Sequence, residues 1–182
     1  MTHLIYAVGD IHGDLTQLQA IHQLINEDFQ TSKSPSFEIV HIGDLIDRRE
    51  DSKGTVEYLM RGIEDGKPWK VLKGNHDRLM EWFFNDPHKH DPNLKPDYSW
   101  LHHRIGGVET LASYGVKVPE NYRECLDEIL KMAIQAVPTS HINFIKNYFQ
   151  SSFKFLFYKR FDDISIRTRN FCIFKNLVTC IR

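Results

Sequence analysis

The chain has 182 residues, of which 41% are apolar and 26% are charged, and its formal net charge is −1. A chain of this length can bury a core of its own, and the small net charge argues against a surface for nucleic acid or anionic lipid. No apolar run approaches the roughly 20 residues of a membrane-spanning helix, so we expect no membrane partner. The three cysteines are odd in number and lack ligand spacing, which favours free thiols and a cytoplasmic location.

Strand and helix patterns alternate through the first half of the chain. This order is typical of a mainly parallel sheet with helices packed on it, and therefore of an α/β fold. Strands are predicted over LIYAV (4–8), FEIVHI (37–42) and WKVLK (69–73), and helices from Asp14 onward, over 51–66 and over 77–84.

The second half of the chain begins with a segment that has no regular pattern. Residues 86–105 contain three prolines and four histidines and are predicted to form an insertion loop. We expect its histidines to be exposed polar residues and Trp100 to be a packing residue. Helices are predicted over 106–116, 120–137 and 139–150.

The three predicted strands end in the same way. Each is followed by glycine and then by a polar residue, as in Gly9-Asp10, Gly43-Asp44 and Gly74-Asn75. The carboxyl ends of parallel strands lie along one edge of a sheet, so these side chains and the nearby His12 should converge. Carboxylates forced together repel each other unless a cation lies between them. Oxygen and imidazole ligands without thiolate suit Mn²⁺, Fe²⁺ or Zn²⁺.

Three further aspartates near the strand ends have a simpler interpretation. Asp14, Asp51 and Asp77 each precede a predicted helix. An aspartate in this position is commonly the residue that caps the helix N-terminus. We therefore predict helix caps, and no metal ligands, at these three positions.

The motifs GDIHG (9–13), GDLIDRR (43–49) and GNHD (74–77) resemble those of the calcineurin-like metallophosphoesterases. More narrowly, they are similar to the motifs of PPP-type phosphatases, which include bacterial serine/threonine protein phosphatases and symmetrical diadenosine tetraphosphatases. The resemblance implies an αββα sandwich with a mainly parallel sheet. It also implies two divalent metal ions, with Mn²⁺ as first choice and Fe or Zn as alternatives, and hydrolysis by metal-activated water.

The resemblance also implies a role for each motif residue. His76 would be the general acid that protonates the leaving oxygen, Asp47 would orient it, and Arg48 would clamp a phosphate oxygen. The implied metal ligands are Asp10 and His12 for the first ion, Asn75 for the second, and Asp44 as the bridge between both.

The sequence departs from the family pattern in two places. Arg49 replaces the glycine of the family's DRG motif, and an arginine there would be strained if the position requires a positive φ. The family also supplies two later histidines to the second metal, whereas no histidine follows His141. We expect the second metal site to be weakened, because even the loss of a residue that only hydrogen-bonds to a metal ligand lowers metal affinity by about 10–100-fold.

The composition changes near residue 151, so we divide the chain into an N-terminal part of a metallophosphoesterase domain (1–150) and an atypical tail (151–182). The tail has seven Lys and Arg against two Asp and Glu, six Phe, and no Gly, Pro or His. One hypothesis is that it is out-of-frame or degenerate. The rival is a lineage-specific ending, in which FKFLFY (153–158) would form an added strand. An incomplete sandwich should leave an open sheet edge.

The function that this resemblance implies is metal-dependent phosphoester hydrolysis. The expected partner is a phosphorylated protein or a small phosphoester substrate. A phosphorylated protein is the first choice, because DRR keeps the Asp-Arg pair, and the enzyme would be a serine/threonine protein phosphatase. The alternative enzyme is a diadenosine tetraphosphate hydrolase. The alternative from another class is a catalytically dead remnant that binds a metal or a partner.

Overall fold

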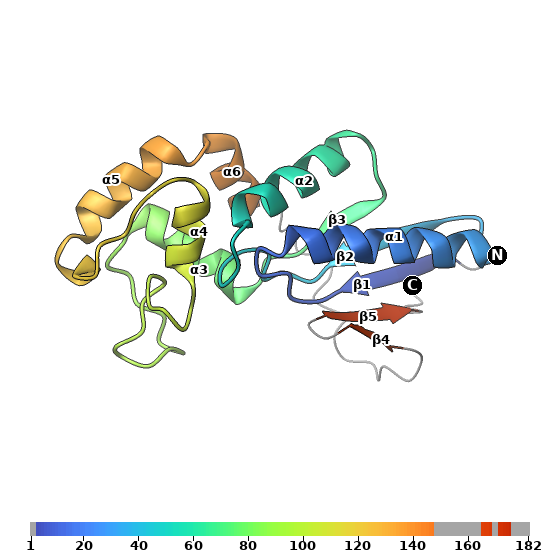
Figure 1. Ribbon diagram of the computed structural model, residues 1–182, viewed down its shortest axis with the longest axis horizontal. Helices are drawn as coiled ribbons and strands as arrows, with labels where there is room; N and C mark the ends of the chain where they lie inside the picture. The colour runs from blue at the N-terminus through green and yellow to red at the C-terminus, as the bar shows by residue number, and fades with distance from the viewer. Residues whose placement is uncertain (1–2, 148–164, 169–170, 176–182) are drawn as a thin grey trace.

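The computed structural model describes residues 3–147, 165–168 and 171–175 of the chain (Figure 1). A five-stranded sheet in the order β3-β2-β1-β5-β4 forms its centre. The β1, β2 and β3 strands are parallel, which confirms the predicted α/β fold with a parallel strand core. The strands are β1 (Leu4–Val8), β2 (Phe37–His41), β3 (Trp69–Val71), β4 (Ser165–Thr168) and β5 (Phe171–Lys175).

The helices form two groups. Figure 1 shows α1 and α2 running along the sheet, whereas α3 to α6 gather beyond the end toward which β1 points. None of the helices in the described part of the chain is long and apolar enough to cross a membrane. The helices are α1 (Leu15–Thr31), α2 (Ser52–Glu64), α3 (Asn75–Asn85), α4 (Gly107–Ser113), α5 (Leu126–Ala136) and α6 (Thr139–Asn147), with a 3₁₀ turn, η1 (Tyr122–Glu124), before α5.

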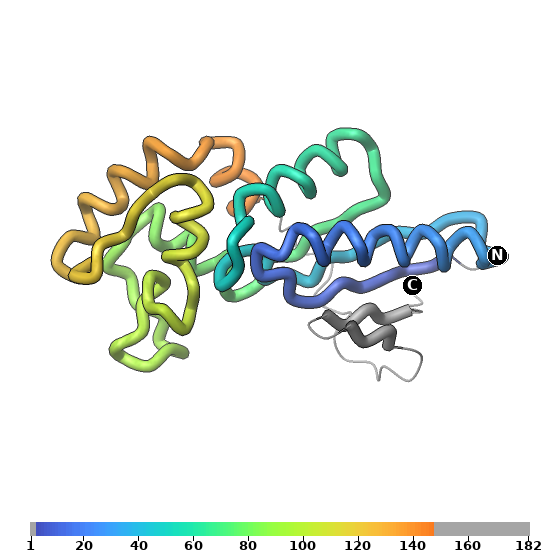
Figure 2. Tube along the Cα trace, viewed as in Figure 1, coloured from blue at the N-terminus to red at the C-terminus, as the bar shows by residue number. Residues whose placement is uncertain are grey.

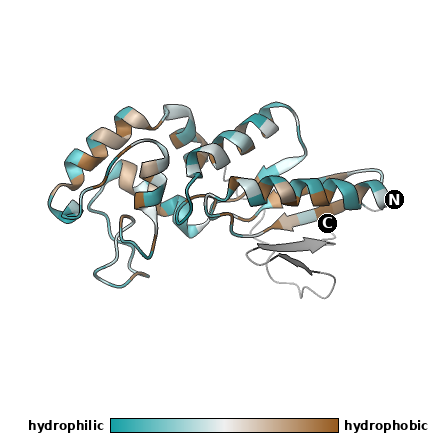
Figure 3. Cartoon of the chain, viewed as in Figure 1, coloured by the Kyte–Doolittle hydropathy of each residue, from teal (hydrophilic) through white to brown (hydrophobic). Residues whose placement is uncertain are grey.

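The α1 helix forms because its sequence combines a cap with one apolar face. The Asp14 carboxylate accepts a hydrogen bond from the Gln17 backbone N–H at 3.1 Å, which confirms the predicted cap. Leu18, Ile21 and Ile25 recur at helical spacing and are at most 2% exposed. Figure 3 shows the result, with β1 largely apolar and α1 alternating between apolar and polar residues. Burial of this face fixes α1 against the sheet.

The edge of β1 is paired rather than open. β5 runs antiparallel to β1, with Tyr6 opposite Lys175 and Val8 opposite Ile173, and β4 continues the sheet beyond β5. The open edge expected of an incomplete sandwich therefore does not lie at β1, because the atypical tail supplies backbone partners for this strand. The predicted strand over 153–158 lies outside the described residues.

The segment between α3 and α4 is the predicted insertion loop. It contains neither helix nor strand, and Figure 2 shows it looping out from the helical group. The loop is nevertheless anchored to the body of the protein. Trp100 is 4% exposed and packs on the Phe83 ring with 5.0 Å between ring centroids. Asp91, also buried, accepts a hydrogen bond from the Arg78 guanidinium at 3.0 Å. The loop can therefore hold side chains in fixed positions.

A chain of hydrogen bonds crosses the core between α2, α1, β2 and β3. The Lys70 carbonyl can only accept, so His41 Nδ1–H donates to it at 2.9 Å and His41 Nε2 carries a lone pair. His22 Nε2–H then donates to His41 Nε2 at 2.8 Å, and the Tyr58 hydroxyl donates to His22 Nδ1 at 2.9 Å. All the ring nitrogens are satisfied when both imidazoles are neutral.

Acid should destabilise the protein through these two imidazoles. Burial lowers the pKa of His22 to about 3 and the pKa of His41 to about 4. An unfolded histidine has a pKa of about 6.5, so below that pH the unfolded state binds protons that the folded state excludes. The free energy of unfolding should therefore fall by up to about 1.4 kcal/mol per pH unit for each imidazole, until the pH reaches the folded values.

Urea unfolding between about pH 7 and about pH 4.5 measures this decline. The variant His41→Leu removes one buried imidazole, so its free energy of unfolding should fall less steeply with pH than that of the wild type. His88→Gln changes an imidazole that is 60% exposed, and it should follow the wild type. Equal slopes for all three proteins would contradict the prediction.

Candidate metal centre

The ends of β2 and β3 lie so close together that glycine is required at both. Gly43 has a φ of +101°, and a Cβ there would collide with the backbone of Gly74. A Cβ on Gly74 would collide with the carboxylate and the backbone N of Asp44. The glycines therefore let the two strand ends pack backbone against backbone. This contact places Asp44 beside the N-terminus of α3.

Replacing Gly43 by Ala should destabilise the protein more than the same change at Gly66. Both glycines have positive φ, +101° and +74°, so alanine is strained at either position. Nothing lies within 4 Å of a Cβ at Gly66, whereas a Cβ at Gly43 meets backbone. We expect Gly43→Ala to lower the free energy of unfolding by about 1–3 kcal/mol more than Gly66→Ala, measured by urea unfolding. Equal losses would show that the close approach is not needed.

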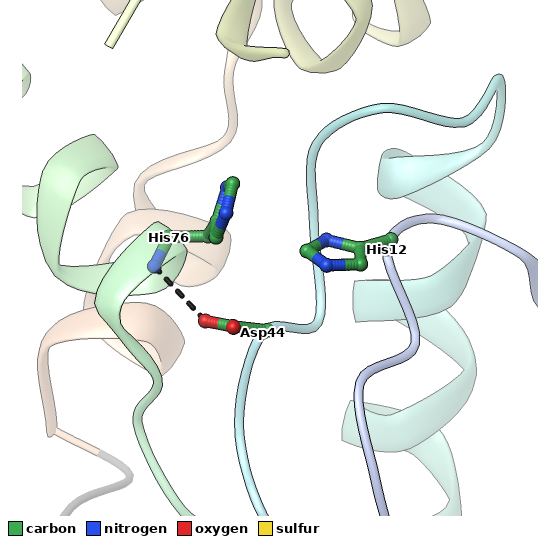
Figure 4. Close-up of side chains that lie close together, drawn as sticks. All are labelled: His12, Asp44 and His76. Carbon is green, nitrogen blue, oxygen red and sulfur yellow. Dashed lines mark hydrogen bonds between the residues drawn. The ribbon is translucent and has the colours of Figure 1, made fainter. Parts of the chain in front are cut away.

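His12, Asp44 and His76 form a cluster at this edge of the sheet (Figure 4). One possible ligand atom from each residue lies within 4.8 Å of the others. The Asp44 carboxylate also accepts a hydrogen bond from the His76 backbone N–H at 3.0 Å. His12 follows β1 and Asp44 follows β2, so the predicted convergence of the strand ends is observed for these two residues. His76, the second residue of α3, joins them.

His12 offers a nitrogen that fits a cation. Its Nδ1–H donates to the Ile46 carbonyl at 3.0 Å, which leaves a lone pair on Nε2. Nε2 is buried and has no hydrogen-bond partner among the described residues. Burial lowers the pKa of His12, so the imidazole is neutral and able to coordinate. A backbone acceptor on one nitrogen and a ligand position on the other is the usual arrangement of a metal-binding histidine.

Positive φ angles gather at the same place. In the described ranges, the non-glycine residues with positive φ are His12 and Asp44 at +50°, Asp47 at +75° and Arg48 at +70°. Such conformations are unfavourable and tend to occur at functional sites. Arg49 does not have a positive φ, so the backbone strain considered for it above does not occur there. Asp47 and Arg48, the two residues before it, have the positive φ angles instead. The backbone conformation thus marks the motif residues independently of their chemistry.

The other two predicted ligands lie at the margin of the cluster. The Asp10 side chain is 61% exposed, and its Oδ2 lies 3.7 Å from His12 Nε2. Asn75 is the first residue of α3 and directly precedes His76. Both are adjacent to the cluster, and their coordination of a metal stays a prediction.

His76 and Asp47 form a buried pair. His76 Nδ1–H donates to Asp47 Oδ2 at 2.8 Å, and the two side chains are 3% and 0% exposed. On the other side of the ring, the Arg48 guanidinium donates to His76 Nε2 at 3.0 Å. The structure therefore brings together the three residues for which catalytic roles were predicted. In this arrangement Nε2 carries a lone pair, so Arg48 must withdraw before a proton can be held there.

Burial is the main cause of the raised pKa values of Asp47 and Asp77, two aspartates next to the cluster. It raises the pKa of Asp47, and hydrogen bonds from His76, Thr110 and Trp100 act against that rise. Burial also raises the pKa of Asp77, to about 7. A buried, charged carboxylate needs hydrogen-bond donors to compensate for its lost hydration, and both aspartates have such donors.

Asp77 takes part in capping α3, as predicted, but from the third position of the helix rather than as the N-cap residue itself. Gly74 is the N-cap of α3, and Asp77 lies inside the first turn, where it is 1% exposed. Its carboxylate accepts from the backbone N–H of Gly74 at 2.8 Å and of Leu45 at 3.0 Å. Asp77 thus ties the loop after β2 to the loop after β3. Asp51 does cap α2, because its carboxylate accepts from the Gly54 N–H at 2.7 Å.

Two residues near the site were not predicted from the sequence. Trp100 and Thr110 both donate hydrogen bonds to the Asp47 carboxylate. They are 53 and 63 residues away from it in the chain, so no local pattern links them. Lys73, which follows β3, has a structural role. Its ammonium contacts the Glu81 carboxylate and the Lys146 carbonyl, each at 2.8 Å.

Comparisons with known proteins identify one family and several solved structures that resemble this chain. The sequence pattern of calcineurin-like phosphoesterases matches residues 3–171. A solved structure of a hypothetical protein from Pyrococcus horikoshii OT3 is 15% identical with a TM-score of 0.46, covering 80% of this chain and 48% of that one. A proposed diadenosine tetraphosphatase is 22% identical with a TM-score of 0.41, covering 81% of this chain and 43% of that one. No curated protein matches the chain. The chain spans less than half the length of these two solved structures.

Proposed function

Because the chain belongs to the calcineurin-like phosphoesterase family, we propose that it hydrolyses phosphate esters with the help of divalent metal ions. The observation that supports this best is the cluster of His12, Asp44 and His76, with Asp47 behind His76 and Arg48 beside it. This is an arrangement in which a ligand nitrogen, a carboxylate and a proton donor face the same small space. We propose phosphoserine and phosphothreonine in proteins as the substrates.

The residues present fit a divalent cation. His12 Nε2 is buried without a partner in the described part of the chain, and the Asp44 carboxylate lies within reach of it. These two side chains would hold the ion, with Asp10 at the margin and Asn75 toward a second ion. Bound divalent cations withdraw charge from a phosphoryl group and make a nucleophilic oxygen available near neutral pH. We propose Mn²⁺, with Fe or Zn as alternatives, because the ligands are oxygen and nitrogen.

His76 is suited to donate a proton to the leaving oxygen. Its ring is fixed by the 2.8 Å hydrogen bond from Nδ1–H to Asp47, so Nε2 keeps one direction. Arg48 contacts Nε2 at 3.0 Å in this structure. A phosphate oxygen that accepts from the planar guanidinium would draw Arg48 away and free Nε2 to carry the transferable proton. Substrate binding and readiness of the acid would thus be linked through one arginine.

A hydrolysis assay of the purified chain tests this function. The chain, with added Mn²⁺, is offered a phosphoserine peptide, diadenosine tetraphosphate and p-nitrophenyl phosphate. Release of phosphate from the peptide supports the proposal, and faster cleavage of diadenosine tetraphosphate would support the alternative enzyme. A folded chain that binds Mn²⁺ but cleaves none of the three would be the catalytically dead remnant, and the proposal would fail.

A further inference from the structure

We infer that Trp100 and Thr110 are positioning residues, which fix the Asp47 carboxylate so that it orients His76 as the proton donor. The inference rests on the proposed function for its catalytic meaning, but the contacts that carry it are structural. Asp47 is 0% exposed, so its carboxylate can be oriented only by protein groups. The described structure supplies three side-chain donors to it, from His76, Trp100 and Thr110.

Trp100 offers an indole N–H whose direction is fixed by packing. Nε1 lies 3.1 Å from Oδ1 and 3.0 Å from Oδ2 of Asp47, so it faces both oxygens. The ring packs on Phe83, and a Cβ on Gly107 would come within 2.7 Å of the indole. Gly107 thus leaves room for the ring, which packs between Phe83 and the backbone of Gly107. A residue needed only to fill the core would not require its polar edge to point at a buried carboxylate.

Thr110 holds both the side chain and the backbone of Asp47. The Thr110 hydroxyl donates to Asp47 Oδ1 at 2.6 Å, and Thr110 Oγ1 also accepts a hydrogen bond from the Asp47 backbone N–H at 2.9 Å. The Ser52 hydroxyl lies 3.0 Å from Thr110 Oγ1 and is its third hydrogen-bond partner. Asp47 has a φ of +75°, so Thr110 contacts the residue at a strained point of the backbone.

Together these contacts divide the two carboxylate oxygens between two tasks. Oδ1 accepts a hydrogen bond from the Thr110 hydroxyl, and Oδ2 accepts one from His76 Nδ1–H. The Trp100 indole N–H faces both oxygens. Loss of either donor would leave a buried carboxylate with fewer partners and allow its plane to rotate. His76 would then lose its fixed direction, although neither Trp100 nor Thr110 touches His76 in these bonds.

Isosteric variants with matched controls test the inference. Thr110→Val removes the hydroxyl at nearly constant volume, Thr110→Ser keeps it, and Trp100→Phe removes the N–H while keeping an aromatic ring. Thr55→Val is the control, because Thr55 is also fully buried but its hydroxyl has no hydrogen-bond partner among the described residues. Urea unfolding establishes that each variant is folded.

The first readout compares two leaving groups. A phosphoserine peptide releases an alkoxide, which needs a proton, whereas p-nitrophenyl phosphate releases a stable phenolate and needs little help. We expect Thr110→Val and Trp100→Phe to lower kcat on the peptide by about 10–100-fold, with much smaller losses on the aryl ester. Thr110→Ser should restore the rate on the peptide. Equal losses on both substrates, or no loss on the peptide, would overturn the inference.

The second readout needs no turnover, so it separates this inference from the proposed function. A strong, buried hydrogen bond from His76 Nδ1–H should give a downfield proton resonance in the metal-free protein, assigned by its absence in His76→Asn. We expect it in the wild type, Thr55→Val and Thr110→Ser, and expect it to vanish by faster exchange in Thr110→Val and Trp100→Phe. Persistence in those two variants would overturn the inference even if the wild type hydrolyses no ester.

Discussion

Replacing Asp44 by Asn should lower the affinity of the chain for Mn²⁺ by about 100-fold or more, since loss of groups outside the ligand shell already costs 10–100-fold. Asp44 is the carboxylate at the centre of the cluster, and its neighbours His12 and His76 bring no negative charge. A neutral amide in its place removes the charge that attracts the ion. Isothermal titration of the metal-free protein with Mn²⁺ measures the change.

Asp14→Asn is the matched control for this prediction. It makes the same chemical change directly after the neighbouring motif GDIHG (9–13), but the Asp14 carboxylate caps α1 through the Gln17 N–H. Asparagine caps helices about as well as aspartate, so Mn²⁺ affinity and stability should both be retained. Equal affinities in the Asp44 and Asp14 variants would show that Asp44 does not bind the metal.

Replacing His76 by Asn should lower kcat on a phosphoserine peptide by about 10²–10⁴-fold, the usual contribution of a general acid. The side chain is 3% exposed and is held by Asp47 on one nitrogen, with Arg48 on the other. Steady-state kinetics on the peptide, with His88→Asn at an exposed histidine as control, measures the effect.

Mn²⁺ affinity distinguishes the two roles that His76 could have in the cluster. If His76 donates a proton and does not coordinate, the His76→Asn variant should bind Mn²⁺ nearly as well as the wild type. A loss as large as that of Asp44→Asn would make His76 a metal ligand and contradict its assignment as the acid. The titration thus tests whether His76 coordinates the metal, which its place within the 4.8 Å cluster does not decide by itself.

The sequence predicts the parts of the fold that depend on neighbours along the chain. The cap at Asp14 and the buried face of Leu18, Ile21 and Ile25 follow from spacing within one helix. The convergence of His12 and Asp44 follows from the rule that parallel strands end at one edge. Both predictions need only local pattern and topology.

The contacts that the sequence does not reveal join residues far apart in the chain. The pairing of His22 with His41 links a helix to a strand, and either residue alone has no distinguishing pattern. The bonds to Asp47 come from Trp100 in the irregular loop and from Thr110 in α4, so they depend on how two segments remote in sequence pack against the loop after β2. The pairing of β5 with β1 likewise depends on tertiary contact, because β-strand formation is decided largely by the partner strand.

Local motifs and long-range contacts meet at the residues with positive φ angles, which are His12, Asp44, Asp47 and Arg48. Each is unfavourable by itself, so it must be maintained by surrounding contacts. At Asp47 these contacts include the backbone bonds to Thr110 and Ser52, at 2.9 Å and 3.1 Å. The site is therefore specified by local motifs but held in shape by residues remote in sequence.

A crystal structure of the chain grown with Mn²⁺, with anomalous scattering recorded at the manganese edge, would show whether His12 and Asp44 hold a divalent cation. We expect an anomalous peak at a manganese ion coordinated by His12 Nε2 and the Asp44 carboxylate, with His76 still hydrogen-bonded to Asp47. A well-ordered site without a peak between His12 and Asp44, while Mn²⁺ is bound elsewhere on the chain, would contradict it.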